Sequence, residues 1–238
     1  MMPRHVSSAW PVLFATVLLA AGCSTSTYEM KLDAIAKPGA TEAQSYRIKS
    51  KNPNLGEESL RYKEAAELVK TALSGNGMYE AASDTAADVI VELDYGIDSP
   101  RTRMERVRVR VYSQASGAHG GAVRLPQAEY VGYYDEMRLV TTYEKYLRLT
   151  ARENKSASEG KPPAELWNVQ VSAEDQSHDL RKYLALMVAA SVDYIDADTG
   201  HQKVVKVRDP SPGLEFIQRG ITASVAPTET PLGASPRN

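Results

Sequence analysis

The stretch DVIVELDYGIDSPRTRMERVRVRVY, residues 88–112, decides the fold class of this protein. Apolar and polar side chains alternate in residues 88–97 and again in residues 104–112. This period of two is typical of strands that bury one face and expose the other. Pro100 lies between the two segments, and we expect the chain to turn there. The stretch therefore predicts an antiparallel hairpin.

The arginine row of the second segment has two interpretations. Arg106, Arg108 and Arg110 could form a basic binding patch. A hairpin centred near the proline would instead set Asp94 and Glu92 opposite the first two of these arginines. Opposite charges that face each other across strands stabilise a sheet by about 0.2–1 kcal/mol. We favour this structural interpretation of the row.

The rest of the chain alternates between segments with strand periodicity and two segments with helical periodicity. Residues 59–74 and 178–195 each place apolar side chains on one stripe, and Ser59 and Ser177 are the expected N-terminal caps. Further strands are expected at residues 28–35, 45–50, 130–152, 165–172 and 203–208. Because hairpins dominate this order, we predict an α+β fold with a mostly antiparallel sheet of about five to seven strands and two main helices packed on one face.

The N-terminus has the features of an export signal. One positive residue, Arg4, precedes a short and mainly apolar segment at residues 9–21, which is too short to span a bilayer. Small residues at positions 20–22 come directly before Cys23, the only cysteine in the chain. A short positive region, a short apolar region and small residues at the end together indicate a cleaved signal peptide.

The sequence LAAGC, residues 19–23, resembles the lipobox of bacterial lipoproteins. The resemblance implies cleavage between Gly22 and Cys23, and then addition of fatty acyl chains such as palmitate to the sulfur and the new amino group. Several acyl chains form a stable anchor, because each buried methylene contributes about 0.8 kcal/mol. In that family an Asp directly after the cysteine commonly retains the protein in the inner membrane, so the resemblance and Ser24 together imply the outer membrane, on its periplasmic side. The alternatives are a signal peptide with an incidental cysteine and a buried structural cysteine.

These observations divide the chain into four parts. Residues 1–22 are the expected lipoprotein signal peptide, and residues 23–27 are a short lipidated tether. Residues 28–209 form a single expected α+β domain. Residues 210–238 are rich in Pro, Ser, Thr and Gly, and we expect a mostly disordered tail in which LEFIQ could form one helical turn.

The charge balance limits the classes of partner. The chain has 28 Lys and Arg residues against 30 Asp and Glu residues, with a formal net charge of -2. Such a balance does not produce the positive field that nucleic acid attracts, so we expect no nucleic-acid partner. The membrane is expected to be contacted through the N-terminal lipid alone.

No complete catalytic or metal-binding pattern occurs in the sequence. Histidine and acidic residues lack the spacing of a metal site, and we expect neither a metal nor another cofactor. His119, Gly120 and Gly121 resemble part of the loop that supplies oxyanion donors in esterases, but the G-x-S-x-G nucleophile motif is missing. We therefore expect no catalytic residues; the alternative is a periplasmic hydrolase that uses His119.

The tyrosines Tyr130, Tyr133 and Tyr134 are the candidate contact surface. The chain has 13 Tyr but only 2 Phe and 2 Trp, a balance that suits sheet surfaces with buried rings and solvated hydroxyls. Exposed tyrosines serve protein or glycan recognition, and the partner would be another envelope protein or cell-wall glycan. The alternative is that these three rings line an edge or pack under the sheet.

Several longer segments carry a second resemblance. SYRI, LRYKEAAELVKTAL, ADVIVELDY and ELWNVQV together resemble a family of Gram-negative envelope lipoproteins built around a domain of unknown function. That family implies no assigned activity and no site residues beyond the lipobox. We expect a non-catalytic outer-membrane lipoprotein, a periplasmic binding or assembly module. The alternatives are a periplasmic hydrolase and a cell-wall glycan-binding protein.

Overall fold

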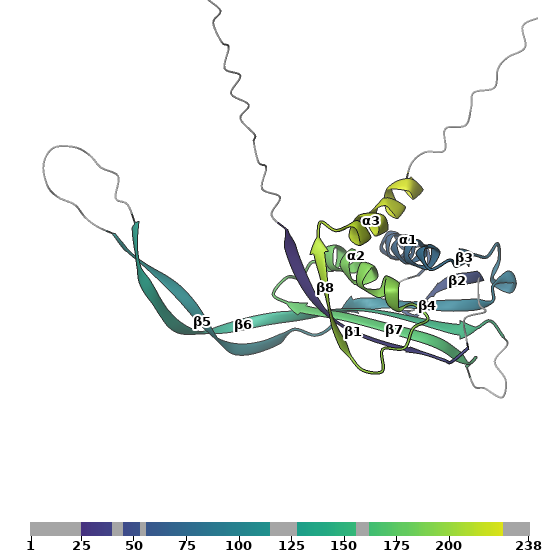
Figure 1. Ribbon diagram of the computed structural model, residues 1–238, viewed down its shortest axis with the longest axis horizontal. Coiled ribbons are helices and arrows are strands. Elements are labelled where there is room, and N and C mark those ends of the chain that lie inside the picture. Colours follow the sequence, from purple (N-terminus) through teal and green to yellow (C-terminus); the bar gives the residue numbers. More distant parts are fainter. Residues whose placement is uncertain (1–24, 40–44, 53–55, 115–127, 156–161, 226–238) are drawn as a thin grey trace, which may run out of the picture.

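The computed structural model describes residues 25–39, 45–52, 56–114, 128–155 and 162–225. Three helices cover one face of a large sheet, and a long two-stranded ribbon extends from the sheet beyond them (Figure 1). The strands are β1 (Ser26–Ala36), β2 (Ser45–Ser50), β3 (Tyr79–Glu80), β4 (Val89–Ile97), β5 (Arg101–Gln114), β6 (Ala128–Glu153), β7 (Glu165–Asp175) and β8 (Lys203–Asp209). The helices are α1 (Leu60–Gly75), α2 (Leu180–Ser191) and α3 (Pro212–Val225), with short 3-10 turns η1 (Asp84–Ala86) and η2 (Val192–Tyr194).

The α+β class is confirmed, but the sheet is mixed and has eight strands. Its order is β3-β2-β4-β6-β7-β1-β8, and β5 pairs with β6 outside this path. β2 runs parallel to β3 and β4, and every other described pair is antiparallel. The expected mostly antiparallel sheet of five to seven strands is therefore corrected. The reason is α1, since a helix between two neighbouring strands returns the chain to its starting end and makes the strands parallel.

The core lies between the sheet and the helices. β4 alternates between buried and partly exposed side chains, as its sequence predicts. The fully buried side chains of the sheet and the helices include Leu32, Val91, Leu147, Leu149, Val171, Leu73 and Met187.

The N-terminal caps of the two predicted helices differ from expectation. The Ser59 side chain makes no capping hydrogen bond, and the cap of α2 is Asp179, whose Oδ1 accepts a hydrogen bond from Lys182 N at 3.1 Å, rather than Ser177.

Helix α3 corrects the expectation for the C-terminal segment. Residues 210–238 were expected to be mostly disordered, yet α3 packs against α1 and α2. Leu214 and Ile217 are buried there. At Gly220 the helices approach so closely that an added Cβ would lie 1.8 Å from Thr71 Oγ1 on α1. The segment is thus a third helix of the domain up to residue 225.

The expected hairpin at Pro100 is wrong. β4 pairs with residues 145–153 of β6, and β5 pairs with residues 128–142 of the same strand, both antiparallel. β4 and β5 therefore run in one direction along a single long partner, and the chain reverses between β5 and β6 instead. Asp94 consequently pairs with Arg148 at 3.4 Å and not with Arg106.

Candidate functional site

The β5–β6 ribbon is the most distinctive surface of the molecule. We call β5 and residues 128–142 of β6 the arm. The 26 residues of β6 span roughly 85 Å at about 3.3 Å per residue. Only residues 143–153 of β6 pair with the sheet strands β4 and β7. No third strand pairs with the arm in the described part of the chain, and the arm projects away from the helices (Figure 1).

The arm carries most of the large apolar side chains that are exposed in the described part of the chain. Fourteen large apolar side chains are exposed among the described residues, and nine of them lie on the arm. Their exposed fractions run from 38% to 71%, and they are Met104, Val111, Tyr112, Tyr130, Val131, Tyr133, Tyr134, Met137 and Leu139. So many exposed apolar side chains on one projecting element indicate an interaction site, because a soluble monomer rarely leaves a large apolar surface uncovered.

Register divides these side chains between two faces. Residues directly opposite each other on paired strands share a face. One face therefore holds the facing pairs Met104–Leu139, Arg106–Met137, Arg108–Asp135, Arg110–Tyr133 and Tyr112–Tyr130. We call this the tyrosine face. Tyr134 faces Val109 and lies on the opposite side of the ribbon.

Three rings on the tyrosine face form a cluster. Tyr130 and Tyr133 have ring centroids 5.3 Å apart, and Tyr130 and Tyr112 have centroids 6.1 Å apart, both in edge-on contact. The Arg108 guanidinium lies 5.8 Å from the centroid of Tyr133. Partial desolvation and a hydrogen bond with Tyr133 raise the pKa of Tyr130. We call Tyr112, Tyr130 and Tyr133 the tyrosine cluster.

A β-bulge assembles this cluster. Positions 130 and 133 differ by three, so a regular strand would send their side chains to opposite faces. The register shifts between Val111 and Tyr112, opposite Gly132, which has a φ of 152°. A bulge inserts one extra residue and so restores Tyr130 to the face of Tyr133. The structure thus joins two of the three predicted tyrosines, places Tyr134 on the other face, and adds Tyr112, which sequence reasoning missed.

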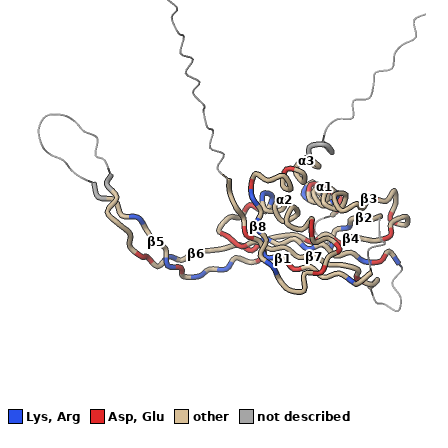
Figure 2. The backbone as a smooth tube through the Cα atoms, viewed as in Figure 1, with Lys and Arg blue, Asp and Glu red and all other residues tan. Residues whose placement is uncertain are grey.

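The tyrosine face is also basic. Arg108 lies 3.8 Å from Asp135, a weak exposed ion pair. Arg106 and Arg110 form no ion pair with any other described residue. The expected pairing of this arginine row with Asp94 and Glu92 is wrong, since Glu92 pairs with Arg152 at 3.4 Å. Figure 2 shows the basic positions along the projecting arm.

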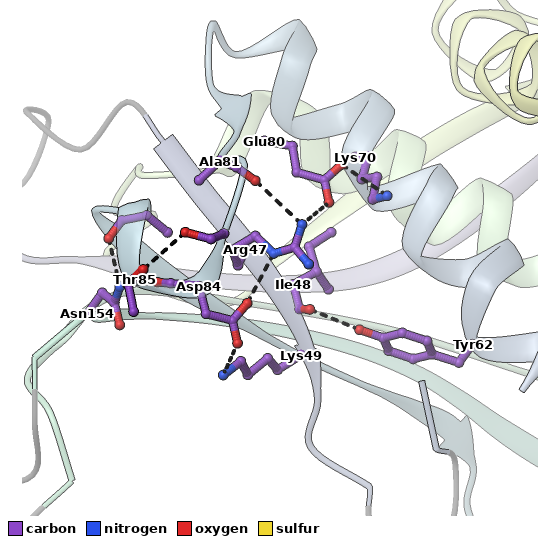
Figure 3. A network of polar contacts seen from close by, with 12 residues as sticks. Arg47, Ile48, Lys49, Tyr62, Lys70, Glu80, Ala81, Asp84, Thr85 and Asn154 are labelled. Carbon is purple, nitrogen blue, oxygen red and sulfur yellow. Dashed lines mark hydrogen bonds and ion pairs between the residues drawn. The ribbon is translucent and has the colours of Figure 1, made fainter. Parts of the chain in front are cut away.

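A second polar cluster, beside β2, is internally satisfied. Arg47 contacts Glu80 at 3.0 Å and Asp84 at 3.2 Å (Figure 3). Lys49 forms a second ion pair with Asp84, at 2.8 Å. Lys70 forms a second ion pair with Glu80, at 3.0 Å. Hydrogen bonds from Lys49 first, and then from Arg47, lower the pKa of Asp84. Each carboxylate thus holds two cations, and we interpret the cluster as a clamp that joins β3 and η1 to β2 and α1.

Other predicted residues fall outside the described ranges. These are Gly22 and Cys23 of the lipobox and His119 of the glycine loop. Within the described ranges, no group of three or more His, Cys, Asp or Glu side chains could hold a metal ion. None of the helices in those ranges is long and apolar enough to cross a membrane.

Comparisons with known proteins find little. No protein-family model matches the chain, and no curated protein matches it. Among solved structures, the chain is similar to a PDZ domain protein from Parabacteroides distasonis, with 12% identity and a TM-score of 0.42. The match covers 76% of this chain and 39% of that protein.

Proposed function

We propose that this protein is a non-catalytic lipoprotein of the outer membrane that binds another envelope protein through its arm. The lipobox around Cys23 supports an anchor on the periplasmic side. The exposed apolar side chains of the arm support the binding role, and this is the single observation that carries it. Burial of such surface in a partner would supply the main driving force for docking.

The composition of the tyrosine face favours a protein as the partner. Tyr, Met and Arg are the residue types enriched in protein interfaces, and all three alternate on this face. The ribbon also has a free backbone edge on each side in the described part of the chain, and such edges pair with added strands. Arg106 and Arg110 would meet acidic groups on the partner, since they have no ion-pair partner among the described residues.

Site-specific photocrosslinking in intact cells tests this proposal. A photoreactive residue replaces Met137, which is 54% exposed on the tyrosine face, or Tyr79, which is 59% exposed on β3, as the matched control. We expect one discrete protein adduct from position 137 and none from position 79. Substitution of the tyrosine cluster by serine should abolish that adduct, because the cluster would form the centre of the interface.

Two results would count against protein docking. Equal crosslinking from positions 137 and 79 would indicate non-specific contact. Co-sedimentation of the purified chain with isolated cell-wall sacculi, lost in the serine variant, would favour the glycan-binding alternative instead. The two assays use the same variant, so they separate a protein partner from a glycan partner.

A further inference from the structure

We propose that a cavity between α1, β4 and the start of α2 binds a small amphipathic carboxylate. The cavity has a volume of about 540 Å³. Small-molecule sites usually enclose about 300–1,000 Å³. The side chains that line it include Arg61, Glu64, Tyr95, Ile97, Leu180 and Leu184. This site lies on the helix-covered side of the sheet and is independent of the arm.

Tyr95 is the residue that points to a ligand. It lines the cavity and is 6% exposed. Its hydroxyl is the one buried side-chain polar atom without a hydrogen-bond partner in the ranges that the structure describes. Buried hydroxyls almost always have a partner. Burial raises the pKa of Tyr95, so the hydroxyl keeps its proton and can donate a hydrogen bond to a ligand oxygen.

The charges around the cavity favour an anionic ligand group. Glu64 accepts a hydrogen bond from Arg181 Nε at 2.6 Å, and Asp179 caps α2. Arg61 has no ion pair with another described residue, and its charge acts on the Tyr95 hydroxyl. A carboxylate in the cavity could therefore accept from the tyrosine and pair with the arginine, the charge-assisted arrangement that gives the strongest hydrogen bonds.

The apolar side chains of the cavity favour a ligand that also has an apolar group. Ile97, Leu180 and Leu184 line the cavity beside the charged groups. A ligand with only a carboxylate would leave these side chains against water, whereas an alkyl or aryl group would cover them. The shared chemistry is thus one carboxylate on a short apolar body.

Calorimetric titration of the full acylated chain in lipid nanodiscs tests the site. The probes are octanoate and 3-phenylpropionate, and the comparison ligands are octanol, which lacks the carboxylate, and acetate, which lacks the apolar body. Empty nanodiscs correct for partition into lipid. We expect saturable binding of at least one probe, and roughly tenfold weaker binding with Tyr95→Phe or with Arg61→Gln, since each removes one charge-assisted contact. Arg106→Gln on the arm is the matched control and should leave binding unchanged.

The outcomes separate a ligand site from a structural role of Tyr95. Tyr95→Phe should keep or raise the thermal midpoint, because it removes an unpaired buried hydroxyl. A lower midpoint, with unchanged probe binding, would show that the hydroxyl serves folding and would overturn the proposal. Absence of saturable binding by both probes would also overturn it, as would octanol binding as tightly as octanoate.

Discussion

Lys145 of β6 is completely buried, and its ammonium group pairs with the carboxylate of Asp175 at the end of β7. The same carboxylate accepts a hydrogen bond from the hydroxyl of Tyr183 on α2. The ammonium also lies 4.4 Å from the centroid of the Tyr183 ring. This cluster therefore ties the sheet to α2, at the level of the sheet where the arm begins.

Removal of Asp175 should destabilise the protein strongly. Asp175→Ala leaves the buried ammonium without a counter-ion, and we expect a loss of about 3–5 kcal/mol in the free energy of unfolding. Lys145→Met should cost less, because the Asp175 side chain is 39% exposed and remains solvated. Urea unfolding of the detergent-solubilised chain measures both. If both variants lost the same free energy of unfolding, the larger cost could not be assigned to the buried, unpaired ammonium of Lys145.

The same cluster should make stability depend on pH at the acidic end. Burial acts to raise the pKa of Asp175, but the hydrogen bonds from Lys145 and Tyr183 outweigh burial and lower the pKa overall. The unfolded carboxyl has a pKa of about 3.9, so the contribution is complete above about pH 5 and is lost as pH falls through the lower folded value. Asp175→Asn should flatten the acid limb of a stability profile measured between pH 2 and 6.

Helix α3 should depend on the absence of a side chain at residue 220. Gly220→Ala would place a methyl group 1.8 Å from Thr71 Oγ1, and α3 would have to move away from α1. We expect a loss of about 1–3 kcal/mol, typical of an over-packed contact, and faster proteolysis of the C-terminal segment. Thr71→Ala in the same chain should recover part of the loss. If Gly220→Ala alone left cleavage unchanged, α3 would not be docked as described.

The tyrosine cluster should matter for binding and not for folding. Serine at Tyr112, Tyr130 and Tyr133 should change the free energy of unfolding by less than about 0.5 kcal/mol per site, as for other exposed positions. Leu147→Ala, at a fully buried position of the same strand, should cost about 2–5 kcal/mol and serves as the control. Comparable losses in the two variants, measured by urea unfolding, would mean that the arm contributes to the core.

The proposed anchor predicts a mass and a location. Wild-type protein purified from membranes should carry the mass of acyl chains on Cys23, and Cys23→Ala should lack it and leave the membrane fraction. Ser24→Asp should keep the acyl mass but shift the protein toward the inner membrane on a sucrose gradient. Intact-protein mass spectrometry decides the first point, and a wild-type chain without lipid would refute the anchor.

Parts of the molecule were predictable because their signals are local. The alternation in β4 and the apolar stripe of α1 follow from backbone geometry alone, and both elements lie within one or two residues of expectation. Lys145 shares its face of β6 with Leu147 and Leu149, because alternate residues of a strand point to the same side. This pattern indicates a buried cation and could have been recognised in the sequence. The two-residue strand β3 is too short to show a pattern. In α3, by contrast, Leu214, Ile217 and Ile221 recur at helical spacing, but the high Pro, Ser, Thr and Gly content of residues 210–238 favoured the interpretation as a tail.

The sequence by itself determined the α+β class, the positions of most strands, and the inward and outward faces of β4. Only the tertiary structure decided which strands pair with each other and which side chains face each other across them. Asp94 could face an arginine in residues 104–112 or in residues 145–153, since both segments carry arginines on the polar face of a strand. That choice, the bulge that unites Tyr130 with Tyr133, and the docking of α3 all depend on contacts between residues distant in the chain. Local periodicity sets which way a side chain points, but the free energy of the whole packed sheet selects what it meets.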